Sequence, residues 1–173
     1  MKKLTLNVGC GDRTYDEYPT GFTCVNFDTR RSLGKVDVVG DARVLPFEGG
    51  RFDYILASDI IEHFPIKETG AVLKEWCRVL KSNGIIEFRL PNIAAVCKYY
   101  VTVENVLPED KARYTSWLLY GGQEYTGNFH YVAFDRAWFR SICSGMGLKE
   151  VSYKEDGFNM IIKMLKLRDI IGG

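Results

Sequence analysis

The hydrophobic pattern divides the chain into short β-type runs and segments with helical spacing. Runs rich in β-branched and aromatic residues predict seven strands, at residues 4–8, 22–27, 36–39, 52–57, 84–90, 148–153 and 158–165. The last two runs are separated by the turn-forming residues 154–157, which predict an antiparallel hairpin near the end of the chain.

Apolar residues at helical spacing predict four helices. They recur at this spacing in the stretch 73–80, and again after Asn92 and Asp135, two residues that favour the N-terminal cap of a helix. Pro108 is placed to begin a further helix that runs to about residue 120. Three cysteines fall on the apolar faces of these helices, and we expect them to pack in the core: Cys77, Cys97 and Cys143.

Strands that alternate with helices predict a parallel sheet with right-handed crossovers. We therefore expect an α/β fold, a Rossmann-like three-layer sandwich whose mostly parallel sheet is closed by an antiparallel hairpin strand. Residues 1–173 form one domain, with 91–130 as a helical insertion and candidate lid. The connections 12–21 and 29–35 are short for crossover helices. We therefore expect that few helices cover one face of the sheet. A partner subunit or residues 91–130 would then cover this face.

Composition narrows the classes of function. The chain has 173 residues, 46% of them hydrophobic, and a net charge of +1, which suits one folded domain without the basic surface that nucleic acids require. No apolar stretch approaches the length of about 20 residues that spans a membrane, and the start does not resemble a signal peptide. The five cysteines match no zinc spacing. We expect a cytoplasmic protein with reduced thiols, no metal site and no membrane or nucleic-acid partner.

Polar residues follow each of the first four predicted strands. Gly9-Cys10-Gly11 follows the first strand, Asp28 the second and Asp41 the third, and the fourth is followed by Ser58, Asp59, Glu62 and His63. In an open parallel sheet, ligands bind beyond the carboxyl ends of the strands, so these residues predict one binding edge.

The spacing of Asp28 indicates the kind of ligand. A carboxylate about 20 residues after a glycine turn can accept hydrogen bonds from both ribose hydroxyls. Thr14 stands where dinucleotide-binding loops have their third glycine, and the following segment is a poor helix. A pyrophosphate favours a helix N-terminus, so the pattern favours a nucleoside without phosphates over a nicotinamide dinucleotide.

Five stretches together resemble a known family. They are Leu6–Gly11 (LNVGCG), Leu45–Phe47 (LPF), Phe52–His63 (FDYILASDIIEH), Leu80–Gly84 and Gly121–Phe134. In order and spacing the chain resembles the class I S-adenosylmethionine-dependent methyltransferases over nearly its whole length. The resemblance implies a seven-stranded sheet with an antiparallel last strand, S-adenosylmethionine as cofactor, and methyl transfer as activity.

The resemblance also implies which residues bind the cofactor: Gly9, Cys10, Gly11, Asp28, Asp41, Ala42, Ser58 and Asp59. Asp28 would hold the ribose hydroxyls, and Asp41 the adenine amino group with the Ala42 backbone beside it. Ser58 and Asp59 would lie near the methionine group. The chain departs from the family at Asn7, where an acid is common, and at Arg13, where the wider pattern has a glycine.

The two histidines of the chain, His63 and His130, are the candidate catalytic residues. A methyl acceptor needs a general base when it is a hydroxyl or a protonated amine. For each histidine, a structural role, with the ring hydrogen-bonded to a backbone carbonyl, is an equally weighted alternative. We expect a small-molecule acceptor, such as a sugar or a cell-envelope precursor. A non-catalytic S-adenosylmethionine-binding or assembly module is the alternative function, and self-association into a homo-oligomer stays open.

Overall fold

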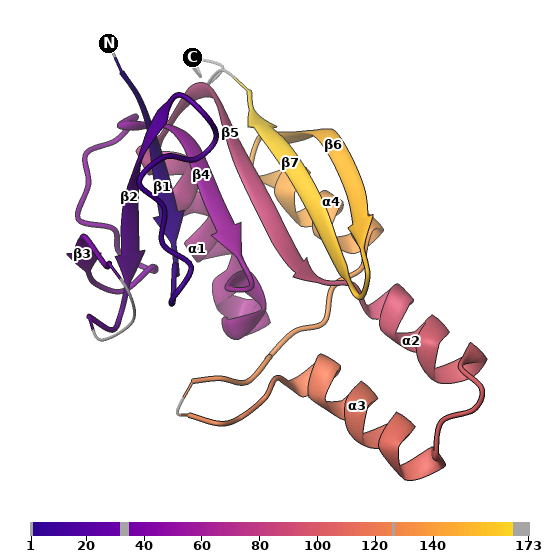
Figure 1. Ribbon diagram of the computed structural model, residues 1–173. Helices are drawn as coiled ribbons and strands as arrows, with labels where there is room; N and C mark the ends of the chain where they lie inside the picture. Colours follow the sequence, from indigo (N-terminus) through magenta and orange to yellow (C-terminus); the bar gives the residue numbers. More distant parts are fainter. Residues whose placement is uncertain (1, 32–34, 126, 168–173) are drawn as a thin grey trace.

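The computed structural model describes residues 2–31, 35–125 and 127–167, and these contain one sheet of seven strands (Figure 1). The strands are β1 (Lys3–Val8), β2 (Phe22–Asp28), β3 (Val38–Val39), β4 (Phe52–Ser58), β5 (Leu80–Pro91), β6 (Leu148–Asp156) and β7 (Asn159–Lys166). Their order is β3-β2-β1-β4-β5-β7-β6, with β1 to β5 parallel and β7 antiparallel to both of its neighbours. The predicted α/β fold class is therefore confirmed.

The four α-helices lie where the sequence predicted them, and one short 3-10 helix was not predicted. They are the short 3-10 helix η1 (Ile61–His63) and the α-helices α1 (Ile66–Val79), α2 (Ile93–Thr102), α3 (Pro108–Tyr120) and α4 (Arg136–Gly145). The Asn92 side chain accepts a hydrogen bond from the Ala94 amide, and Asp135 accepts one from the Trp138 amide, as N-caps do. None of the described helices is long and apolar enough to cross a membrane.

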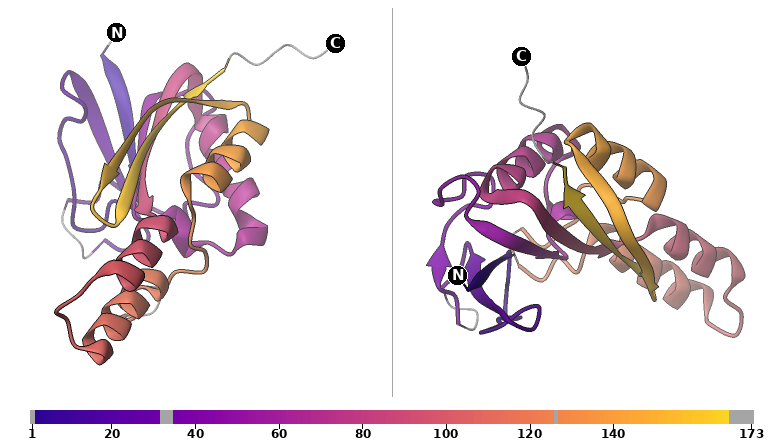
Figure 2. Two further views of the ribbon diagram at one scale, coloured as in Figure 1. Left: turned by 90° about the vertical axis from the view of Figure 1, so that its right-hand side faces the viewer. Right: turned by 90° about the horizontal axis from the view of Figure 1, so that it is seen from above.

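One face of the sheet carries the hydrophobic core beneath α1 and α4 (Figures 1 and 2). Trp76 of α1 and Phe139 of α4 are fully buried, and both rings lie against Phe88 of β5, with centroids 6.2 and 4.9 Å away. Strand β5 starts at Leu80, earlier than predicted, because its register with β4 skips residues 81–84 in a bulge.

The opposite face is covered by the loop between β1 and β2. Asn7 donates to the Arg13 carbonyl (2.8 Å), and Asn26 both donates to the Tyr15 carbonyl (2.8 Å) and accepts from its amide (3.0 Å). Thr5 donates to the Tyr18 carbonyl. These bonds explain why polar residues alternate along β1. In the described part of the chain, no helix lies on this face (Figure 2).

The expectation that residues 91–130 cover this face is wrong. Helices α2 and α3 form an arm that extends past the carboxyl ends of the parallel strands (Figure 1). Val96 is the buried residue of α2, and α3 has none. Cys97 is therefore exposed, contrary to the prediction that it packs in the core, because its helix packs mainly on α3 rather than on the sheet.

Candidate functional site

All ten predicted site residues line one cavity of about 680 Å³. They are Gly9, Cys10, Gly11, Asp28, Asp41, Ala42, Ser58, Asp59, His63 and His130. The cavity lies beyond the carboxyl ends of β1, β2 and β4, and the segment that follows α3 forms its other wall. Its volume is typical of small-molecule sites.

The glycine turn is shaped by two left-handed residues. Gly9 has φ 66° and Gly11 has φ 54°, a region that glycine adopts readily and other residues do not. A Cβ added to Gly9 would lie 2.2 Å from Cδ1 of Ile60, whereas a Cβ on Gly11 would meet no atom within 4 Å. Burial raises the pKa of the Cys10 thiol to about 12. The thiol therefore stays protonated, which supports a packing role over a nucleophile.

Asp28 ends β2 and is 7% exposed. Its Oδ2 accepts from the Gly11 amide (2.9 Å) and its Oδ1 from the Arg30 amide (3.0 Å). Oδ1 also accepts from the Thr29 hydroxyl (3.3 Å), so Oδ2 is the oxygen that can accept a further hydrogen bond from the cavity. This carboxylate and the open space beside Gly11 fit the ribose of a nucleoside.

The loop after β3 is held by α1. The Ala42 carbonyl accepts from Nε1 of Trp76 (2.9 Å), and this bond fixes the backbone next to Asp41. Asp41 itself accepts from the amide and Nε of Arg43 (2.9 and 3.1 Å) and is about half exposed. Its carboxylate therefore lies at the rim of the cavity.

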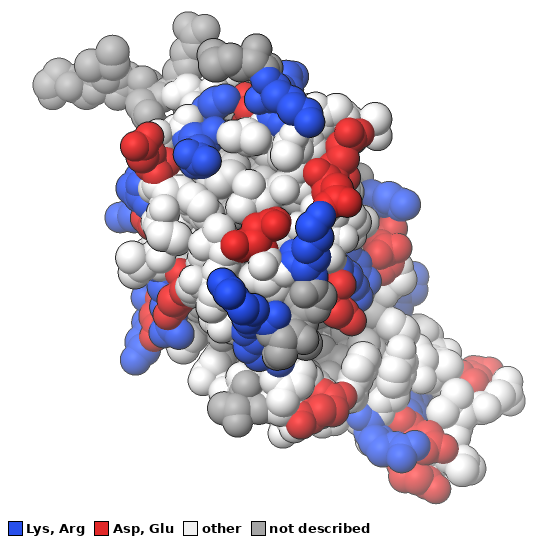
Figure 3. Space-filling view, turned by 60° about the vertical axis from the view of Figure 1, so that its left-hand side comes forward, with Lys and Arg blue, Asp and Glu red and all other residues white. Residues whose placement is uncertain are grey.

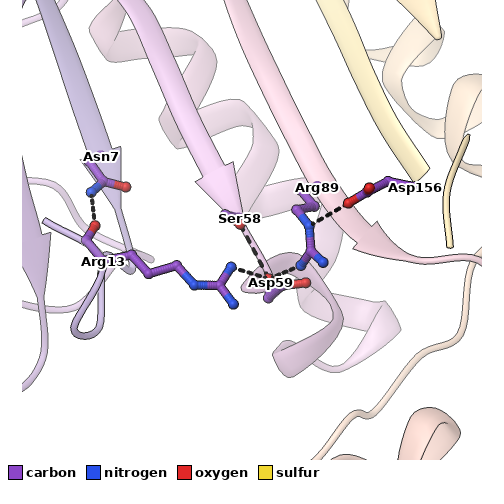
Figure 4. A network of polar contacts seen from close by, with 6 residues as sticks. All are labelled: Asn7, Arg13, Ser58, Asp59, Arg89 and Asp156. Carbon is purple, nitrogen blue, oxygen red and sulfur yellow. Dashed lines mark hydrogen bonds and ion pairs between the residues drawn. The ribbon is translucent and has the colours of Figure 1, made fainter. Parts of the chain in front are cut away.

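Asp59 lies between two arginines (Figure 4). It accepts from Nη1 of Arg13 (3.1 Å), from Nη1 of Arg89 and from the Ser58 hydroxyl (3.2 Å). Arg89 also pairs with Asp156 of the β6–β7 hairpin (3.2 Å). Arg13, which the sequence showed only as a departure from the family pattern, thus lines the cavity and pairs with a predicted site residue.

Glu62 belongs to the predicted binding edge, but the sequence analysis assigned it no role. It is 1% exposed, and among the described residues neither carboxylate oxygen has a hydrogen-bond partner. Burial raises its pKa to about 8. Its position between Asp59 and His63, directly after a strand, was the signal that could have indicated a role.

The two histidines meet although 66 residues separate them in sequence. Their ring centroids lie 4.9 Å apart. Nδ1 of His63 lies 3.0 Å from the Phe129 carbonyl and 3.2 Å from the Gly127 carbonyl, so we assign the ring proton to Nδ1. Burial lowers the pKa of both histidines, and their proximity lowers that of His130 further. Both imidazoles are therefore neutral at pH 7.

Comparisons with known proteins agree with this geometry. Residues 6–88 match a family model described as a methyltransferase domain. A protein from Pyrococcus horikoshii has a crystal structure with TM-score 0.69 and 20% identity, over 96% of this chain and 82% of that one. A putative methyltransferase from Bacillus halodurans has TM-score 0.66 and 16% identity, over 96% and 93%.

A third solved structure contains ligands. The 1,6-didemethyltoxoflavin-N1-methyltransferase of Burkholderia thailandensis, with 1,6-didemethyltoxoflavin and S-adenosylhomocysteine bound, has TM-score 0.65 and 14% identity, over 96% of this chain and 72% of that one. A comparison with curated protein sequences found no match.

Proposed function

We propose that this chain, whose residues 6–88 match a methyltransferase domain model, uses S-adenosylmethionine to transfer a methyl group to a small-molecule acceptor. One observation carries the proposal: a single cavity has a carboxylate and glycine turn at one end and two neutral histidines at the other. The Burkholderia structure of the same fold, which contains 1,6-didemethyltoxoflavin and S-adenosylhomocysteine, supports a small acceptor.

The cofactor end would hold the nucleoside and the amino-acid group separately. Asp28 would accept from the ribose hydroxyls while the Gly11 amide keeps the carboxylate in place. Arg13 and Asp59 offer a cation and an anion 3.1 Å apart, which suits the carboxylate and ammonium of a methionine group. When bound, S-adenosylmethionine supplies a methyl group on a sulfonium, which needs no further activation as an electrophile.

The acceptor end would position the nucleophile and remove its proton. His63 and His130 are neutral, and the hydrogen bonds of His63 to backbone carbonyls leave its Nε2 free to accept a proton from a hydroxyl or an ammonium. Because alkyl transfer requires contact between two reactants, holding them in one partly closed cavity supplies much of the rate.

A small acceptor also agrees with the surface. The net charge is +1, and on the face shown in Figure 3 basic and acidic side chains are interspersed rather than gathered by sign. A polyanion such as a nucleic acid would require a field of one sign. We therefore propose a metabolite with a hydroxyl or amino nucleophile, of which sugars and cell-envelope precursors are the first to test.

The test has a binding step and a transfer step. Calorimetry should show binding of S-adenosylmethionine and S-adenosylhomocysteine but not NAD. Transfer of a labelled methyl group to a panel of sugars and envelope precursors should then fall by roughly 100-fold in His63→Asn or His130→Asn, with cofactor affinity unchanged. Glu48→Gln, an exposed residue outside the cavity, is the control. Cofactor binding without transfer to any acceptor would favour the non-catalytic alternative instead.

A further inference from the structure

Three side chains with metal-binding atoms converge at the acceptor end of the cavity. Glu62 and His63 come from η1, and His130 comes from the segment after α3. Each offers one ligand atom, and these atoms all lie within 4.8 Å of one another. We call this group the Glu62–His63–His130 cluster. All three residues line the cavity, so an ion held by them would face the acceptor.

The carboxyl group of the cluster has no hydrogen-bond partner among the described residues. Glu62 is 1% exposed, and both of its oxygens are buried without a hydrogen bond. A buried, unpartnered carboxylate is costly, and buried polar groups are nearly always satisfied by protein, water or an ion. Its environment therefore indicates a ligand that this side chain would bind.

His63 is oriented as metal-binding histidines are. Nδ1 of His63 donates to the backbone carbonyls of Phe129 and Gly127, which leaves the lone pair on Nε2 available. The His130 ring meets the His63 ring edge-on, with an interplanar angle of 82° and centroids 4.9 Å apart. Metal-binding histidines almost always donate their other ring N–H to a carbonyl, a carboxylate or water, which fixes the tautomer and the direction of the ring.

We infer that the Glu62–His63–His130 cluster binds one divalent transition-metal ion, with zinc or cobalt the preferred ions. Two imidazoles and one carboxylate are a donor set of catalytic zinc sites, which keep a further position open. Magnesium and calcium prefer all-oxygen ligands and are not expected to bind here. The 4.8 Å limit means that the side chains would move slightly inward around the ion.

The ion would select the class of acceptor. This step rests on the proposed function: the open position would bind an acceptor hydroxyl, which becomes more acidic on the ion and releases its proton to solvent. The two histidines would then serve the acceptor as ligands of the ion rather than as proton acceptors. Acceptors with an ionisable hydroxyl are favoured over amines.

The experiment measures metal binding directly. The protein is prepared without a histidine tag and with Cys97→Ser, because this exposed thiol could bind metal itself. After chelator treatment and dialysis, zinc is titrated by calorimetry, and cobalt by its visible absorption. We expect one equivalent of either ion, no binding of magnesium, and affinity weaker by roughly 100-fold or more in Glu62→Gln and in His130→Asn. Glu48→Gln should bind like the unchanged protein.

Three results would overturn the inference. They are no zinc or cobalt binding by folded protein, equal binding in both cluster variants, and full methyl transfer after chelation. Far-UV circular dichroism checks that each variant is folded. Because the two variants lie in different segments, one can still be tested if the other does not fold. S-adenosylmethionine affinity is measured on the same samples. If the protein binds S-adenosylmethionine but no zinc or cobalt, the metal site is wrong and the proposed function stands. If it binds the metal but not S-adenosylmethionine, the proposed function is wrong and the metal site stands.

Discussion

The two ends of the cavity are built in different ways. At the cofactor end, consecutive strand ends place the glycine turn, Asp28 and Asp59 side by side, and each carboxylate accepts hydrogen bonds from the protein. At the acceptor end, η1 meets a segment more than 60 residues later, and the Glu62 carboxylate has no partner among the described residues.

This difference separates a site formed by folding from a site completed by its ligand. Two backbone amides, of Gly11 and Arg30, donate to Asp28, so its position depends largely on the strand ends themselves. The acceptor end depends on contacts between distant segments, such as the bond from the Tyr131 amide to the Glu62 carbonyl (2.8 Å). We expect substitutions at the cofactor end to affect stability and cofactor affinity, and those at the acceptor end to affect turnover.

Gly9→Ala should have the largest effect, since it disturbs the scaffold of the cofactor end. Its Cβ would overlap Ile60 in a left-handed backbone, and the two costs together reach about 3 kcal/mol of unfolding free energy. Gly11→Ala is the matched control, because it has the left-handed φ without the overlap and should cost about 1–2 kcal/mol. Denaturant unfolding of both variants measures the difference. Equal losses would mean that Ile60 moves aside freely.

Asp28→Asn should lower cofactor affinity by roughly 100-fold, because hydrogen bonds to a charged carboxylate contribute about 1.5–3 kcal/mol each. Calorimetry with S-adenosylhomocysteine measures this without interference from turnover. Asp16→Asn is the control, since Asp16 is an exposed carboxylate that pairs with Lys35 outside the cavity. Unchanged affinity in Asp28→Asn would show that the ribose is held elsewhere.

Tyr125→Ala tests the contact that joins the two ends. The guanidinium of Arg30, just after β2, lies 4.2 Å from the ring centroid of Tyr125, in the segment after α3. Exposed cation–π contacts contribute about 0.5–1 kcal/mol, so the substitution should weaken cofactor binding by about three-fold. Tyr100→Ala removes a similar contact with Lys111 outside the cavity and should leave binding unchanged. A loss of 100-fold would instead indicate that this segment closes over the cofactor.

The sequence correctly indicated that the residues of the proposed cofactor end meet at one edge of the sheet. A glycine turn and polar residues after four strands identify one sheet edge, because parallel strands share a direction. Gly9, Asp28, Asp41 and Asp59 all line the one cavity, and their roles in cofactor binding remain predictions. What the sequence did not reveal was Arg13 as a partner of Asp59, because an ion pair between two loops leaves no periodic pattern.

The acceptor end and the arm were harder to predict for a physical reason. Apolar spacing in α2 correctly indicated a helix but not what the helix packs on, so the exposure of Cys97 could not be foreseen. Likewise, the unpartnered state of Glu62 depends on how η1 folds against the segment 127–131. Local patterns specify helices and strands, whereas contacts between distant segments depend on the whole packed chain.

The smallest expected effect is a pH dependence at the support of the cofactor end. Glu75 of α1 accepts from the Leu45 amide (2.8 Å) and from Arg78 (2.7 Å), which fixes the loop that contains Ala42. The hydrogen bond from Arg78 lowers the pKa of Glu75 below its usual 4.5. A lowered carboxyl pKa adds stability that is complete above the unfolded value and is lost as pH falls through the folded value.

Glu75→Gln should therefore flatten the decline in melting temperature between about pH 5 and pH 3, since the variant has no carboxylate to protonate. Near pH 7 it should melt slightly below the unchanged protein, because the charge-assisted bond to Arg78 is gone. Glu104→Gln, an exposed carboxylate between α2 and α3, should follow the unchanged curve. If Glu75→Gln keeps the full acid slope, the loop at the cofactor end is held by the bond from Trp76 to Ala42 instead.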